Sequence, residues 1–443
     1  MRSFAILGVL AVCGCSATSP GARIGQEAPA TPPAPSGDAK DDAKSDAKDE
    51  APPKRDVWHG HLPIGFANTG ICFGNSKDWN GLRFNWSDDD LGTINGINTT
   101  LWAAAGGDAT GDVNGIGIGL ISNIAENLRG VTVALGVNAA ESDMKGVHVA
   151  GFLNGSGKEL TGVGGALFVN GAGRSMTGVH VAGLVNGCGG DLRGVNAALL
   201  VNGSGGDVCG VSLAGLVGGS GGSVDGVNVA GLVGGCGGSA TGVTAAGFVS
   251  GAGQDVTGLT LAGITAGAGR DATGITVALG SAGAGRTMHG ISLALGFLEA
   301  GGHTKELDEA LEKMQSDIEK SVEQGEKVDA TDVTDKIEEA QKRGELGEAD
   351  PGTIAGIAVT GLRARAGSMR GVVAALGHLN AKDFKGLGIS LCTRIEKAQT
   401  GVTFGAFNHA ETIDGFGFQL GLINHIPTNP SWARWLPLIN WQM

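Results

Sequence analysis

The chain has 443 residues, of which 82 are Gly and 12 are Pro, and its formal net charge is -13. The absence of a Gly-X-Y triplet excludes collagen, and a hydrophobic content of 42% excludes a chain that is disordered throughout. The negative charge argues against nucleic acid as a partner, because such binding depends on Lys and Arg side chains that neutralise phosphates.

The first fifteen residues predict an export signal. Arg2 supplies a positive start, and the apolar stretch from Phe4 to Val12 is too short for a transmembrane helix. The run Val12-Cys13-Gly14-Cys15 resembles the lipobox of bacterial lipoproteins. This resemblance implies a signal peptide over residues 1–14 and a covalent lipid on Cys15. Since Ser16 follows, it also implies the bacterial outer membrane; an ordinary cleaved signal peptide is the alternative.

Residues 15–55 carry the lipid and then a tether rich in Ala, Pro, Asp and Lys, with the near-repeat DAKDDAKSDAKDE. This composition cannot bury a hydrophobic core, so we expect the tether to be disordered. It would hold a folded body away from a membrane surface.

A sixteen-residue repeat dominates the rest of the chain. Regular copies are expected over residues 113–302, after a Trp-containing cap with irregular repeats at 56–112. An Ala stands four residues after each repeat Gly. Looser repeats of 14–15 residues follow at 351–428, and a Trp-containing cap at 429–443. Regularity of this kind predicts stacked identical units. The repeat glycines are Gly130, Gly146, Gly162, Gly178, Gly194, Gly210, Gly226, Gly242, Gly258, Gly274 and Gly290.

One unit, from Gly178 to Arg193, reads GVHVAGLVNGCGGDLR. Its alternation predicts a strand from Val179 to Asn186, with His180 and Ala182 on one face and Val179 on the other. The run GCGGD predicts a tight turn in which Gly takes positive φ. The apolar residue before each repeat Gly, such as Met176, is expected in a short second strand.

Two all-β architectures fit this repeat. In a β-solenoid each unit is one coil, and equivalent residues stack about 4.8 Å apart. In a β-barrel meander each unit is one strand of membrane-spanning length. Identical turns, the absence of Tyr and the absence of Trp between Trp102 and Trp432 favour the solenoid. Residues 303–350 interrupt the array, and their stripe of Leu307, Leu311 and Met314 predicts an inserted α-helical hairpin.

The unit Gly-Val-x-x-Ala-Gly-Leu-Val-Asn and the ending GFGFQLGLINHIPTNPSWARWLPLIN resemble the bacterial surface-repeat lipoproteins of spirochaetes and Bacteroidetes. The resemblance covers about residues 93–302 and 352–443. It implies an envelope or surface location, and it brings no activity and no site residues with it.

No nucleophile, acid and base come together in the sequence, so we predict no enzyme, no metal and no cofactor other than the lipid. Acidic turn positions would stack on neighbouring coils. They are either solvated carboxylates or weak calcium-binding turns resembling GGxGxD. These positions are Asp191, Asp207, Asp255 and Asp271. A structural ladder of buried amides is expected from Asn138, Asn154, Asn170, Asn186 and Asn202.

The expected function is that of a non-enzymatic envelope or surface lipoprotein with a structural or partner-binding body. The expected partners are the membrane, through the lipid anchor, and a second copy or another envelope protein, through an apolar repeat face. The alternative is a transmembrane β-barrel involved in transport or permeation. The residues nominated for the apolar face are Ala182, Leu184, Ala214, Leu216, Ala230 and Leu232.

Overall fold

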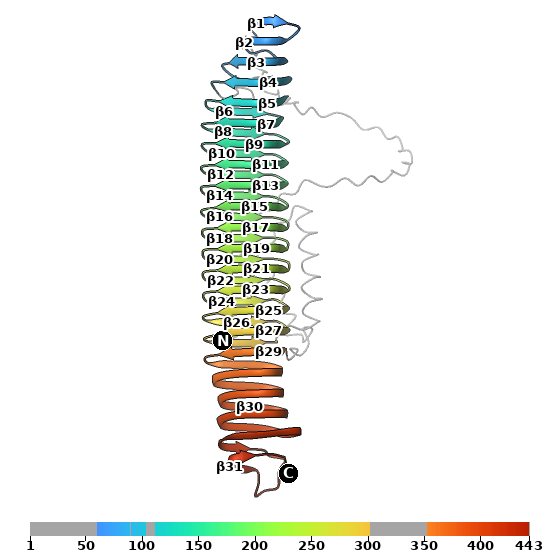
Figure 1. Cartoon of the computed structure of the whole chain (residues 1–443), viewed down its shortest axis with the longest axis vertical. Helices are drawn as coiled ribbons and strands as arrows, with labels where there is room; N and C mark the ends of the chain where they lie inside the picture. The colour runs from blue at the N-terminus through green and yellow to red at the C-terminus, as the bar shows by residue number, and fades with distance from the viewer. Residues whose placement is uncertain (1–59, 89, 103–110, 302–351, 443) are drawn as a thin grey trace, which may run out of the picture.

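The computed structural model describes residues 60–88, 90–102, 111–301 and 352–442. These residues form a β-solenoid, with strands stacked along one long axis (Figure 1). In the parts of the chain that the structure describes, no helix has the length and hydropathy of a membrane span. The signal peptide, Cys15, the tether and the predicted helical hairpin at 303–350 lie outside the described residues.

Each regular coil contains one long and one short strand. The long strands are β5 (Asp112–Gly119), β7 (Asn127–Ala134), β9 (Met144–Ala150), β11 (Glu159–Ala166), β13 (Ser175–Ala182), β15 (Leu192–Ala198), β17 (Val208–Ala214), β19 (Val224–Ala230), β21 (Ala240–Ala246), β23 (Val256–Ala262), β25 (Asp271–Ala278), β27 (Thr287–Ala294) and β29 (Thr353–Thr360). The short strands are β6 (Ser122–Ala125), β8 (Val137–Ala140), β10 (Leu153–Ser156), β12 (Val169–Ala172), β14 (Val185–Cys188), β16 (Val201–Ser204), β18 (Val217–Ser220), β20 (Val233–Cys236), β22 (Val249–Ala252), β24 (Thr265–Ala268), β26 (Ser281–Ala284) and β28 (Phe297–Ala300).

Strands one repeat apart pair in parallel and in register. In the long strands Gly162 pairs with Gly178, and in the short strands Asn154 pairs with Asn170. A meander with one strand per repeat would pair its neighbours antiparallel, so that alternative is wrong. The register also continues across the insertion, because Gly290 pairs with Gly356.

The two ends of the rod differ from its middle. At the N-terminal end β1 (His61–Phe66) folds back antiparallel on β2 (Thr69–Gly74), and β3 (Trp79–Asn85) and β4 (Thr93–Thr100) follow in parallel. At the other end β30 (Arg363–His425) winds through several coils without a break, and β31 (Trp435–Asn440) closes it antiparallel. Both terminal strands contain a Pro, Pro63 and Pro437, which removes an N–H from an edge that could otherwise pair with another chain.

The interior holds a column of apolar side chains two residues before each repeat Gly, and most of them are large. Met144, Leu160, Met176 and Leu192 are fully buried there. They belong to the long strand, so the separate second strand predicted at this position is wrong. The predicted strand from Val179 to Asn186 is also divided, because the chain bends between β13 and β14.

Positive φ occurs at the repeat glycines and not in the GCGGD turn. Gly178 has a φ of 128°, whereas Gly189 and Gly190 of the turn fall outside the positive region. A β-carbon at Gly178 would overlap with the carbonyl oxygen of Gly162 on the preceding coil. The repeat Gly is therefore required both by its backbone conformation and by the close stacking of the coils.

Candidate functional site

Two ranks of side chains two residues apart point outward from the long strands, and we call them the aliphatic face. Parallel pairing in register places the same repeat position of every coil in one rank. The members range from exposed to half-buried; the exposed fraction is 43% at Val179 and 52% at Val181. The first rank is Val131, Val147, Val163, Val179, Val195, Val211, Val227, Val243, Leu259, Ile275 and Ile291; the second is Val133, Val149, Gly165, Val181, Ala197, Leu213, Val229, Ala245, Leu261, Val277 and Leu293.

The structure corrects the predicted outward stripe. Ala182, Ala214 and Ala230 are buried and point into the rod. The other nominated residues, Leu184, Leu216 and Leu232, lie at the bend between the long and short strands and are half-buried or exposed. The prediction placed the alternation one residue out of phase, because both sides of the strand carry apolar or small residues.

The predicted Asn residues line the interior along the short strands. The side-chain Nδ2 of Asn138 donates to Oδ1 of Asn154 at 2.9 Å, and Asn154 and Asn170 each donate to the next Asn at the same distance. The ladder starts one coil earlier than predicted, because Nδ2 of Asn123 donates to Asn138 at 2.8 Å. All these side chains are buried.

The fifth predicted rung, Asn202, is turned away from the ladder. Its Nδ2 donates instead to the backbone oxygen of Asn196 at 2.9 Å and to Oγ of Ser212 at 3.0 Å. The next position of the column is Gly218, which carries no side-chain amide to continue the ladder. The run of amide-to-amide hydrogen bonds therefore ends at Asn186, whose Nδ2 donates to the backbone oxygens of His180 and Ala197.

Two buried histidines occupy the interior column that faces the Asn ladder. Nδ1 of His148 lies 2.7 Å from Oγ1 of Thr132, while both ring nitrogens of His180 lack a hydrogen-bond partner. Gly164 stands between them, and a β-carbon there would press against His180. Burial lowers the pKa of His148 to about 4, with a smaller effect from His180, and burial also lowers the pKa of His180. Both rings are neutral at pH 7 and pack as part of the core.

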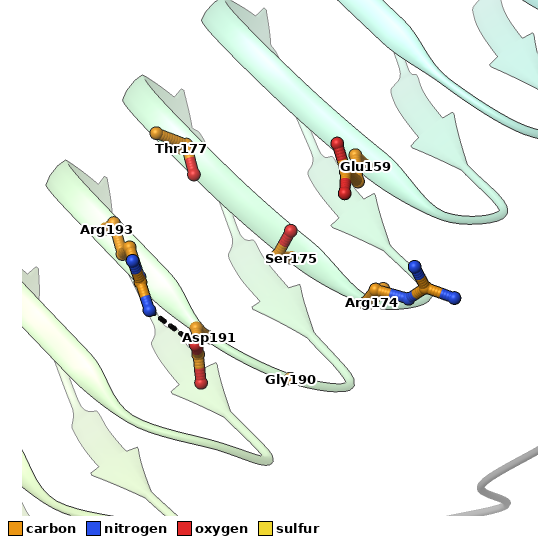
Figure 2. A pocket seen from close by; sticks show the side chains of 7 residues that line it. All are labelled: Glu159, Arg174, Ser175, Thr177, Gly190, Asp191 and Arg193. Atoms are coloured by element: carbon orange, nitrogen blue, oxygen red, sulfur yellow. Dashed lines mark hydrogen bonds and ion pairs between the residues drawn. The ribbon is translucent and has the colours of Figure 1, made fainter. Parts of the chain in front are cut away.

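The acidic turn residues stack on neighbouring coils, and their carboxylates bond to the backbone of the next coil. Oδ1 of Asp191 accepts the N–H of Asp207 at 3.1 Å, and Oδ1 of Asp207 accepts the N–H of Ser223 at 2.7 Å. Arg193 forms an ion pair with Asp191 at 2.9 Å. Figure 2 shows this edge of the rod, where Glu159 and Arg174 line an open groove beside that ion pair.

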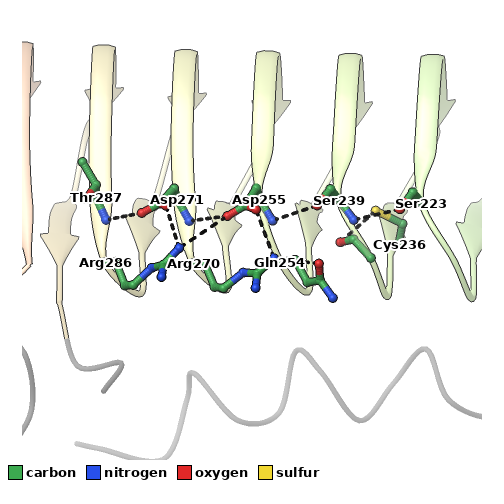
Figure 3. A network of polar contacts seen from close by, with 10 residues as sticks. Ser223, Cys236, Ser239, Gln254, Asp255, Arg270, Asp271, Arg286 and Thr287 are labelled. Carbon is green, nitrogen blue, oxygen red and sulfur yellow. Dashed lines mark hydrogen bonds and ion pairs between the residues drawn. The ribbon is translucent and has the colours of Figure 1, made fainter. Parts of the chain in front are cut away.

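Carboxylates bonded to the backbone of the next coil recur further along the rod, where Arg270 and Arg286 pair with them (Figure 3). Oδ1 of Asp255 accepts the N–H of Asp271 at 3.2 Å, and Oδ2 of Asp255 pairs with Arg270 at 3.1 Å. Oδ1 of Asp271 likewise accepts the N–H of Thr287, and Oδ2 of Asp271 pairs with Arg286 at 2.7 Å. Within the described ranges, no group of three His, Cys, Asp or Glu side chains could hold a metal ion. The four turn carboxylates predicted from the sequence all accept backbone N–H groups of the next coil, and those of Asp191, Asp255 and Asp271 also pair with Arg.

A polar cluster near the N-terminal end was not anticipated. The guanidinium of Arg83 is completely buried, forms an ion pair with Asp88, and donates to Asn98 and Asn75, each at 2.8 Å. Oδ2 of Asp88 accepts a further hydrogen bond from Oγ1 of Thr100 at 2.6 Å. The signal for it was available, because Arg83 and Asn98 stand two residues after Gly81 and Gly96, which share the positive φ of the repeat glycines. This is the interior position that His180 occupies.

Comparisons of the sequence with protein-family models, and of the chain with curated proteins and with solved structures, found no match. The aliphatic face, the turn edge and the interior columns are therefore interpreted from their own geometry.

Proposed function

We propose that this chain is a non-enzymatic lipoprotein of the bacterial cell envelope whose solenoid body associates through its aliphatic face. The observation that carries the proposal is the two-rank aliphatic face. Its eleven regular coils extend on the order of 50 Å along the axis at about 4.8 Å per coil. The largest apolar patch of a typical monomer covers roughly 300–600 Å² and often has a function. A face of this length, with a gap in the second rank at Gly165, favours a surface that a partner covers.

A second copy of the chain is the occupant that this geometry favours. The ranks of one rod repeat with the coil spacing, and the ranks of a second rod have the same spacing, so side chains of two copies can interdigitate along the whole face. The carboxylates of Asp191, Asp255 and Asp271 lie along the turn edge, whereas Arg193, the partner of Asp191, stands on β15 at the border of the aliphatic face. Packing two copies over the two ranks buries aliphatic surface and leaves the ion pair of Arg193 at the edge of the contact.

The membrane anchor rests on the lipobox at the N-terminus. We propose that Cys15 carries the lipid, that the tether spans the distance to the solenoid, and that the protein resides at the outer membrane. The transport alternative depended on a meander of membrane-spanning strands, and the parallel coils remove that premise. We propose no catalytic step.

The anchor is tested by expressing the full chain in bacteria with radiolabelled palmitate. We expect label on the wild-type chain and on Cys13→Ser, and no label on Cys15→Ser. Label that persists in Cys15→Ser would overturn the assignment of the acylated residue.

The association is tested with the full chain carrying Cys15→Ser, studied by sedimentation equilibrium. We expect a concentration-dependent dimer or larger assembly, and Val179→Asp should weaken it at least ten-fold because a carboxylate would be desolvated in the contact. Thr177→Asp is the matched control, since it adds the same charge two residues away on the same strand, at the border of the aliphatic face. A wild-type chain that remains monomeric, or equal effects of the two variants, would contradict self-association.

A further inference from the structure

Two histidines lie side by side near the C-terminal end of the rod. His409 and His425 occupy successive coils of β30, with their ring centroids 5.0 Å apart. Their Nδ1 atoms are only 2.9 Å apart. The indole of Trp435, on β31, stacks on His425 with a centroid distance of 3.8 Å. Both His side chains are half-buried, so solvent reaches the pair.

The separation of the two nitrogens is that of two ligands on one metal ion. Imidazole nitrogens bind first-row transition metals at about 2.0–2.1 Å, and two such bonds to atoms 2.9 Å apart enclose an angle of about 90° at the metal. That angle belongs to the tetragonal sites of Cu²⁺ and Ni²⁺. A tetrahedral Zn²⁺ site would require the nitrogens to be about 3.3 Å apart.

Burial and nearby charged groups both act on the two rings. Burial lowers the pKa of both His409 and His425, while the carboxylate of Glu411 opposes this change. Arg394 lowers the pKa of His409 further, and His409 and Arg434 do so for His425. Glu411 stands two residues after His409 on the same strand and contributes negative charge near the pair.

We propose that Nδ1 of His409 and Nδ1 of His425 chelate one Cu²⁺ or Ni²⁺ ion, with solvent completing a tetragonal set of ligands. The ring that donates the hydrogen bond would first pass its Nδ1 proton to solvent and take one up at Nε2, so that both Nδ1 atoms present a lone pair to the ion. This site is independent of the lipid anchor and of the aliphatic face, and neither His was singled out by the sequence pattern.

The test uses the full chain with Cys209→Ser, because the exposed thiol of Cys209 would itself bind these metals. The probe is NiCl₂, followed by tryptophan fluorescence, since Ni²⁺ beside His425 should quench Trp435. His409→Asn and His425→Asn should each weaken Ni²⁺ binding at least ten-fold. His378→Asn, on another coil of β30, is the matched control and should leave binding unchanged.

A second measurement counts the ligands. With CuCl₂ at one equivalent, electron paramagnetic resonance should show hyperfine coupling to two nitrogens in the Cys209→Ser chain and to at most one in His409→Asn. Unchanged Ni²⁺ binding in the double variant His409→Asn/His425→Asn would overturn the proposal. So would a copper spectrum without two nitrogens, and either result would leave the pair as a hydrogen-bonded stack only.

Discussion

Gly178 stacks directly on Gly162, and a β-carbon added to Gly178 would overlap with the Gly162 carbonyl oxygen. The contact recurs along the array; for example, Gly194 meets Gly178 in the same way. Because these residues also have positive φ, they combine two constraints that only Gly satisfies. The repeat Gly is thus a position of every regular coil at which a side chain meets both constraints at once.

Replacing Gly178 by Ala should destabilise the fold by roughly 2–4 kcal/mol, because the new β-carbon adds a backbone clash to an unfavourable φ. Gly187→Ala, in the same coil, is the control: its φ is not in the positive region, and a β-carbon there would come no closer than 3.7 Å to another coil. Urea unfolding of the full chain with Cys15→Ser measures both. Equal urea midpoints for the two variants would show that the contact between Gly178 and Gly162 does not contribute to the stability of the fold.

Asn154 and Asn228 are both buried, but they differ in hydrogen bonding. Nδ2 of Asn154 donates to Asn170 and to the backbone oxygen of Gly165, whereas neither side-chain polar atom of Asn228 has a partner. Asn154→Ala should cost about 2–3 kcal/mol, since it leaves buried polar atoms unpaired. Asn228→Ala should change stability by less than about 1 kcal/mol, because the loss of packing is offset by removal of an unsatisfied amide. Chemical denaturation distinguishes them, and a larger loss in Asn228→Ala would contradict the role of the ladder.

The parallel coil was predictable because a strict sixteen-residue Gly period leaves few ways to stack units. Which side of each long strand faces the interior was not predictable from the sequence. Val179 is exposed and His180 is buried, the reverse of what hydrophobicity alone suggests. The interior of this narrow rod accepts polar side chains because they bond along the axis, as Asn138 and Asn154 do. The His409–His425 pair escaped notice since it lies where the repeat is irregular and needs side-chain geometry to be seen.

The buried guanidinium of Arg83 should be far more important for stability than an exposed ion pair. Arg83→Ala leaves Asp88 buried without its cation, and we expect a loss of about 3–5 kcal/mol. Arg193→Ala, which removes the exposed pair with Asp191, should cost less than about 1 kcal/mol. Thermal unfolding followed by circular dichroism gives the comparison. Similar melting temperatures for the two variants would show that the Arg83 cluster is not part of the cooperative fold.

The neutral ring of His148 should make the solenoid sensitive to acid. The pKa of His148 is about 4 in the folded chain and about 6.5 when unfolded. Its contribution to stability is therefore complete above pH 6.5. As the pH falls from 6.5 to about 4, the unfolded chain takes up a proton that the folded chain does not, and stability falls by roughly 3 kcal/mol.

His148→Gln removes this titration, so its free energy of unfolding should decrease less between pH 7 and pH 4.5 than that of the wild type, by about 2–3 kcal/mol. His289→Gln, at an exposed position, should follow the wild-type pH dependence. Carboxylates titrate in the same range in all three chains, so the difference between variants isolates the buried ring. Parallel pH profiles for wild type and His148→Gln would mean that this ring becomes protonated without opening the coils around it.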